Sequence, residues 1–146
     1  MNASKMSYRP KVAGIIAAAI MLVAASSGTA LADQVKVTLS GGQEVPAVTT
    51  AASGSGTITI NADKSVSGSV STTGVAGTMA HIHNGAAGTN GPVIIPLTKS
   101  GDSTWSVPAG AKLTDAQYAA YKAGGLYVNV HSAANKGGEI RGQLKP

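Results

Sequence analysis

The chain of 146 residues contains no cysteine and no phenylalanine, and it has only one tryptophan, four tyrosines and three histidines. The absence of cysteine excludes a disulfide framework and a thiolate metal site. Any bound metal must therefore be held by nitrogen, oxygen or thioether sulfur. The scarcity of aromatic residues means that the core is built from Val, Ile, Leu and Ala, a mixture that favours strands.

The first 32 residues have the three parts of a secretory signal peptide. Lys5, Arg9 and Lys11 form a positive start, residues 12–25 are apolar, and residues 30–32 form a small-residue cleavage site. The apolar run is shorter than the roughly 20 residues that cross a bilayer, and no cysteine follows it to carry a lipid anchor. We therefore expect cleavage after Ala32, export to the periplasm or the cell exterior, and no membrane association after cleavage.

Acidic residues are few, and the formal net charge is +5. Three of the eleven basic residues leave with the predicted signal peptide and none of the six acidic residues does, so the mature charge is 8 − 6 = +2. No cluster of basic residues with interleaved aromatics remains. Nucleic acid is therefore not an expected partner.

Residues 33–146 are expected to form a single domain of strands. Short alternating or β-branched segments predict strands, and turn residues between them predict hairpins. Thr114 and Gln117 have the spacing of a capping box, which predicts one short helix near residues 114–122. The strands are expected at residues 34–39, 57–60, 65–70, 93–97, 104–107, 126–131 and 139–144.

Two of the three histidines, His81 and His83, are separated by one residue. On a strand this spacing puts both imidazoles on one face, and Ile82 then points to the core from the other face. In residues 126–131 the apolar residues share one face, which places His131 on the opposite, non-core face with Tyr127 and Asn129. Three imidazoles so arranged are a known way to hold copper or zinc, and we favour copper. The alternative is that they are surface imidazoles with structural hydrogen bonds.

Other residues are candidates for supporting roles at this site. Met79 falls on the face of His81 and His83, where a thioether would favour Cu(I); alternatively it covers apolar surface at the start of the strand. A hairpin of residues 126–131 and 139–144 would place Glu139 near His131 and Arg141 near Asn129. Glu139, Asn129 and Arg141 are therefore the candidates for the shell around the metal ligands.

Three segments resemble the CHRD domain, which is named after chordin. They are residues 39–46, 80–93 and 127–144, and the resemblance spans nearly all of the predicted mature chain. It implies an antiparallel β-sandwich, found as an exported single domain in bacteria and as repeats in chordin. In chordin it also implies a neighbourhood of extracellular protein binding. The alternative function is therefore a metal-free binding or matrix module, whose contact surface would be the exposed sheet face with Tyr127, Asn129 and Gln143.

The order of the motifs is also similar to that of copper/zinc superoxide dismutase, a Greek-key β-barrel. The similarity matches His81, His83, His131 and Arg141, and it implies a Greek-key sandwich or flattened barrel. The chain has no fourth histidine, no His/Asp cluster for zinc and no disulfide. In a dismutase the arginine guides an anionic substrate to copper, whereas here we expect Arg141 to pair with Glu139.

No arrangement of serines or carboxylates in the chain points to another catalytic site. We therefore expect an exported metal-binding protein, most simply for copper handling or protection, with no catalytic residues assigned. If the protein is an enzyme, a copper-dependent dismutase-like activity is the expectation. Glu44, which precedes Val45 and Pro46, is the one acidic residue to which the sequence assigns no structural role.

Overall fold

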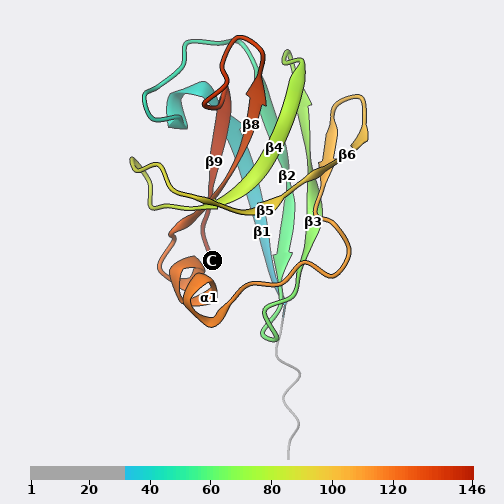
Figure 1. The fold of residues 1–146 in the computed structure, drawn as a ribbon, viewed down its shortest axis with the longest axis vertical. Helices are drawn as coiled ribbons and strands as arrows, with labels where there is room; N and C mark the ends of the chain where they lie inside the picture. Colours follow the sequence, from blue (N-terminus) through green and yellow to red (C-terminus); the bar gives the residue numbers. More distant parts are fainter. Residues whose placement is uncertain (1–31) are drawn as a thin grey trace, which may run out of the picture.

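The computed structural model describes residues 32–146. The predicted signal peptide, residues 1–32, lies outside the described residues except for Ala32. Within the described part, the chain forms nine strands, one 3-10 turn and one helix (Figure 1). These elements are β1 (Asp33–Ser40), η1 (Gly41–Gln43), β2 (Ser53–Ile60), β3 (Val66–Thr73), β4 (Gly77–Asn84), β5 (Val93–Pro96), β6 (Thr98–Gly101), β7 (Thr104–Ser106), α1 (Asp115–Lys122), β8 (Leu126–Ser132) and β9 (Ile140–Leu144).

The nine strands form one antiparallel sheet in the order β5-β4-β8-β9-β1-β2-β3-β7-β6. The first and last strands of the domain, β1 and β9, are neighbours, and β8 lies between β9 and β4. The sheet curls into a nearly closed, flattened barrel (Figure 1). The predicted fold class, an antiparallel all-β barrel or sandwich with one short helix, is confirmed.

The two edges of the sheet are formed by strands that are consecutive in the chain. β5 pairs with β4 at one end of the strand order, and β6 pairs with β7 at the other end. Leu97 alone separates β5 from β6, and its backbone N–H donates to the carbonyl of Ala80 in β4 at 2.9 Å. β6 could not be predicted from the sequence, because its four residues, all of them exposed, carry no alternating apolar pattern.

The core lies inside the barrel and is built from aliphatic side chains, as the composition predicts. In β1 the residues alternate, with Val35, Val37 and Leu39 buried and their neighbours outward. β2 and β3 approach closely at Gly56, where a Cβ would lie 2.1 Å from the carbonyl oxygen of Ser69. Aliphatic burial of this kind stabilises a fold by roughly 25 cal/mol per Å² of apolar surface.

The single helix covers one end of the barrel (Figure 1). Its capping box is confirmed, since Thr114 accepts from the Gln117 backbone at 3.2 Å and Gln117 accepts from the Thr114 backbone at 2.9 Å. Tyr121 is fully buried, and Lys122 forms an ion pair with Asp33 at the start of β1. These contacts fasten the helix to the first strand.

The outer face of β4, β8 and β9 is also covered, by two loops of residues 85–92 and 133–139. All seven residues of β8 are buried, although only alternate ones face the barrel interior. The prediction that Tyr127 and Asn129 lie on an exposed contact surface of a metal-free binding module is therefore wrong, because each is only 2% exposed. The fold thus has a second, polar interior outside the aliphatic core.

Candidate metal centre

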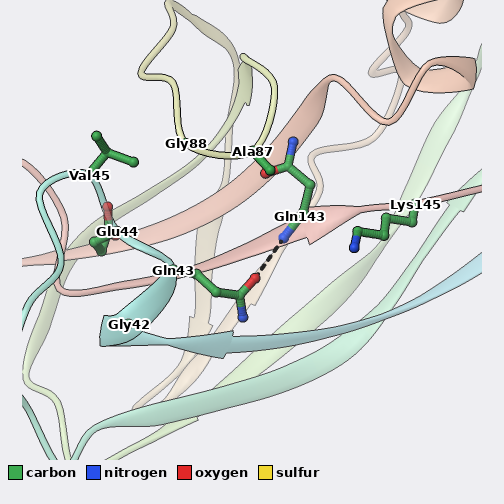
Figure 2. Close-up of a pocket in the computed structure, with 8 residues that line it drawn as sticks. All are labelled: Gly42, Gln43, Glu44, Val45, Ala87, Gly88, Gln143 and Lys145. Carbon is green, nitrogen blue, oxygen red and sulfur yellow. Dashed lines mark hydrogen bonds between the residues drawn. The ribbon is translucent and has the colours of Figure 1, made fainter.

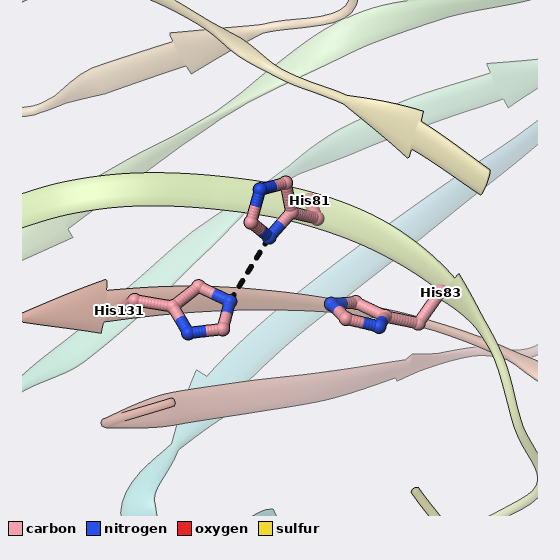
Figure 3. A group of neighbouring side chains, drawn as sticks. All are labelled: His81, His83 and His131. Carbon is pink, nitrogen blue, oxygen red and sulfur yellow. Dashed lines mark hydrogen bonds between the residues drawn. The ribbon is translucent and has the colours of Figure 1, made fainter. Parts of the chain in front are cut away.

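The second interior contains all three histidines. His81 and His83 precede and follow the core residue Ile82 in β4, and both extend from the face of the strand opposite to it. His131 extends from the neighbouring strand β8. Figure 3 shows the three rings grouped close together over the two strands. One ring nitrogen from each residue lies within 4.8 Å of the others, and His81 Nδ1 and His131 Nε2 are 3.0 Å apart.

Backbone carbonyls set the protonation of two of these rings. His83 Nδ1 lies 2.8 Å from the carbonyl oxygen of Gly91, and His131 Nδ1 lies 2.8 Å from that of Lys136. A carbonyl oxygen only accepts, so each Nδ1 carries the hydrogen and each Nε2 keeps its lone pair. The two covering loops therefore present two Nε2 lone pairs for metal coordination.

His81 is the more adaptable member of the cluster. Its Nδ1 faces the lone pair of His131 Nε2, so without a metal it donates its hydrogen to that nitrogen. Moving this hydrogen to its own Nε2 would free the Nδ1 lone pair. One change of tautomer in His81 thus turns the hydrogen-bonded pair into two ligands beside His83.

Burial keeps two of the imidazoles uncharged. Burial lowers the pKa of His81 below its ordinary value, and the neighbouring His131 and His83 lower it further. Burial likewise lowers the pKa of His83, although its hydrogen bond to Gly91 opposes the shift. Because only a neutral imidazole binds a metal ion, these directions keep both rings competent at neutral pH.

A stack of side chains fixes the position of His83. Its ring lies parallel to that of Tyr127, with centroids 4.7 Å apart and 3° between the planes. The guanidinium carbon of Arg141 lies 3.5 Å from the centroid of the Tyr127 ring. Cation–π and stacking contacts of this kind restrict ring rotation. His83 is therefore held from its ring nitrogen and from one ring face.

Arg141 is also the residue that fastens the loop of residues 85–92. It is 1% exposed, and its Nη2 donates to the carbonyl oxygens of Ala86 and Thr89 at 2.9 Å each. Its guanidinium therefore packs against this loop. The hydrogen bonds of Arg141 do not include Glu139, the partner expected from the sequence. Gln143 assists by donating to the carbonyl of Gly85 at 2.8 Å.

The other candidate residues lie at different distances from the cluster. Met79 is directly opposite His131 in the strand register, and its side chain is 51% exposed at the outer margin of the site. Glu139 accepts a hydrogen bond from Thr50 at 2.8 Å, while the acceptor at His131 is the carbonyl of Lys136. The ring acceptors are thus backbone groups, which leave no signal in the sequence.

Glu44 and Asn129 are two further buried polar residues next to the three histidines. Asn129 lies opposite His81 in the register and beside the His83 ring, and its Nδ2 and Glu44 Oε1 both lie against Gly138. Glu44 is 6% exposed. Burial raises its pKa from an ordinary 4.5 to about 7, although the charge of Arg141 and the nearby amide of Asn129 oppose the shift.

Two surface pockets adjoin this region, and Glu44 lines both. The pocket in Figure 2 has a volume of about 220 Å³ and lies between Gln43, Ala87 and Gln143. The second has about 240 Å³ and is bordered by the loop that contains Gly138. None of the three histidines lines either pocket. The pockets therefore reach the far end of the polar interior and not the metal ligands themselves.

Together, the fold and the cluster define a flattened antiparallel β-barrel with three histidines gathered on its covered outer face. Comparison with known protein families finds that the CHRD domain family matches residues 35–144. The chain belongs to that family. No curated protein and no solved structure gives a significant match. Within residues 32–146, no helix is long and apolar enough to cross a membrane.

Proposed function

We propose that the protein is an exported copper-binding protein that holds one copper ion through His81, His83 and His131. Its role would be copper handling or protection in the periplasm or outside the cell. The observation that carries this proposal is the pair of buried Nε2 lone pairs, which the carbonyls of Gly91 and Lys136 hold beside the adaptable ring of His81.

The ligand set favours copper over other divalent ions. Imidazole suits both copper and zinc, and for a given set of nitrogen donors Cu²⁺ binds more tightly than Zn²⁺. Met79 at the margin of the site would add a thioether, which favours Cu(I). The proposed export rests on the pattern of residues 1–32 and on membership of the CHRD family, whose domains occur in extracellular proteins.

The environment of Arg141 gives no support for a dismutase-like reaction. Steering an anion to a metal requires a cation that the anion can reach. Arg141 is 1% exposed, and its guanidinium is engaged by loop carbonyls and by Tyr127. The proposal is therefore metal binding, with Arg141 as a positioning residue for the loop.

Titration of the purified protein with Cu(I) and Cu(II) tests the proposal. We expect one ion per chain, with a dissociation constant below the micromolar range. The His81→Ala/His131→Ala double variant should bind at least about a hundredfold more weakly, a loss of about 2.7 kcal/mol. A Lys99→Ala variant, altered at an exposed residue of β6, is the control and should bind like the wild type.

Two results would contradict the proposal. One is wild-type affinity for both copper ions no tighter than micromolar. The other is unchanged binding by the double variant, which would place the copper elsewhere on the chain.

A further inference from the structure

Three buried polar atoms in the described part of the chain have no hydrogen-bond partner: Glu44 Oε1, His83 Nε2 and Asn129 Oδ1. Each such atom costs roughly 1–3 kcal/mol in a folded protein, so unpaired atoms are rarely found together. Here Asn129 lies beside both of the others, since its Nδ2 and Glu44 Oε1 both lie against Gly138 and its side chain adjoins the His83 ring. Their grouping indicates a place where the metal-free protein is incompletely satisfied.

Asn129 occupies the centre of this group. It lies on the same face of β8 as His131 and directly opposite His81 on β4. On its other side it is opposite Arg141 of β9. It is 2% exposed. Its side chain is therefore enclosed by the ligand strands and has no access to bulk water.

Glu44 fixes which end of the Asn129 amide faces the histidines. The amide nitrogen of Asn129 is the end that lies on the side of the Glu44 carboxylate, and an amide nitrogen is a donor that suits a carboxylate. Gly138 lies against both groups, since a Cβ there would stand 2.4 Å from Glu44 Oε1 and 2.6 Å from Asn129 Nδ2. Asn129 Oδ1 is thus directed to the side of His83.

The atom that Oδ1 then meets is also an acceptor. Because His83 donates from Nδ1 to Gly91, its Nε2 presents a lone pair, and Asn129 lies beside this ring. Two buried acceptors that face each other are satisfied only by something positive between them. A metal ion bound by the histidines would provide it.

We propose that Asn129 Oδ1 is the fourth ligand of the copper centre and that Glu44, by holding the amide and supplying a negative charge, makes the site selective for the divalent ion. The inference rests on the proposed function. An amide oxygen is a hard donor and prefers Cu²⁺ to the softer Cu(I). The three imidazoles contribute no charge, and Glu44 is the buried carboxylate next to them, so it offsets one of the two positive charges.

Separate measurement of Cu(II) and Cu(I) affinity, by competition with chelators of known affinity, tests this inference. In Asn129→Leu, which loses the oxygen, Cu(II) affinity should fall by about tenfold or more, as expected for a lost ligand or ligand support. Its Cu(I) affinity should change by less than about threefold. The Cu(II) electron paramagnetic resonance spectrum should also change, because the donor set changes from three nitrogens and one oxygen.

Glu44→Gln is the second variant, and it keeps the shape and the acceptor for the Asn129 amide. We expect it to weaken Cu(II) binding by about tenfold and to leave Cu(I) binding nearly unchanged, because only the charge is lost. Asn61→Leu is the matched control, since Asn61 is a partly buried asparagine in the β2–β3 turn that hydrogen-bonds Ser65. It should affect neither affinity.

The outcomes separate the two proposals. If the wild type binds neither ion tightly, the proposed function fails. If the wild type binds copper but Asn129→Leu and Glu44→Gln retain the wild-type ratio of Cu(II) to Cu(I) affinity, copper binding stands and this inference is overturned. If Asn129→Leu does not fold, Glu44→Gln decides alone, through the same ratio.

Discussion

Replacement of Arg141 by methionine is expected to lower the free energy of unfolding by about 4 kcal/mol. Methionine fills most of the same volume but removes the two hydrogen bonds from a charged donor to the carbonyls of Ala86 and Thr89, at about 1.5 kcal/mol each. It also removes the cation–π contact with Tyr127, worth about 1 kcal/mol. Equilibrium unfolding in urea measures the change.

The loss of stability in Arg141→Met should be concentrated in the loop of residues 85–92. Hydrogen exchange of the backbone amides of residues 85–92 should accelerate, because Arg141 fastens this loop. His83 depends on Gly91 of the same loop for its tautomer, so copper affinity should fall in parallel. Lys145→Met removes one positive charge from an exposed position and is the control. A loss below about 1 kcal/mol with unchanged exchange would show that the loop holds without Arg141.

Replacement of Glu44 by glutamine should stabilise the metal-free protein at pH 8 by about 3 kcal/mol. Burial raises the pKa of Glu44 from 4.5 to about 7, so the folded state binds the proton more tightly than the unfolded state does. A difference of this size corresponds to about 1.4 kcal/mol per pH unit. Glutamine resembles the protonated acid and removes the cost of burying the charge.

The direction of the pKa shift determines the pH range in which the stabilities of the wild type and Glu44→Gln diverge. Below about pH 4.5 Glu44 is protonated in both states, so wild type and variant should have similar stability. Between pH 4.5 and about 7 the unfolded state ionises first, and the stability of the wild type falls relative to the variant. Above about pH 7 the difference should be constant.

Thermal or urea unfolding from pH 4 to pH 8 in the presence of a chelator measures this difference. Asp102→Asn, which removes an exposed carboxyl far from Glu44 in the sequence, is the matched control. A pH-independent difference would mean that the Glu44 carboxylate is not penalised by burial. Glu44→Gln is therefore expected to be more stable yet to bind Cu(II) more weakly, a trade-off typical of functional sites.

Strand parity predicted the placement of the histidines on the face opposite the core. Ile82 is 1% exposed and faces the core, which forces His81 and His83 outward. The hairpin register also followed from the sequence, since Asn129 does lie opposite Arg141. Local rules of alternation and pairing were sufficient for both results.

The covering of that outward face could not be predicted in the same way. It depends on Arg141 donating to loop carbonyls 52 and 55 residues earlier in the chain, and backbone carbonyls carry no sequence signature. Glu44 illustrates the same limit. Its segment has no periodic pattern, and its role arises only from a contact with Asn129 that is distant in sequence.

The two edge strands on either side of Leu97, β5 and β6, also affect how the protein behaves at high concentration. Open sheet edges are templates on which further chains add strands, and proteins blunt such edges with short strands and proline. Here the two terminal strands of the sheet have four residues each, β5 ends at Pro96, and Leu97 already donates to Ala80. These short edge strands on either side of Leu97 therefore also protect the protein against edge-to-edge aggregation.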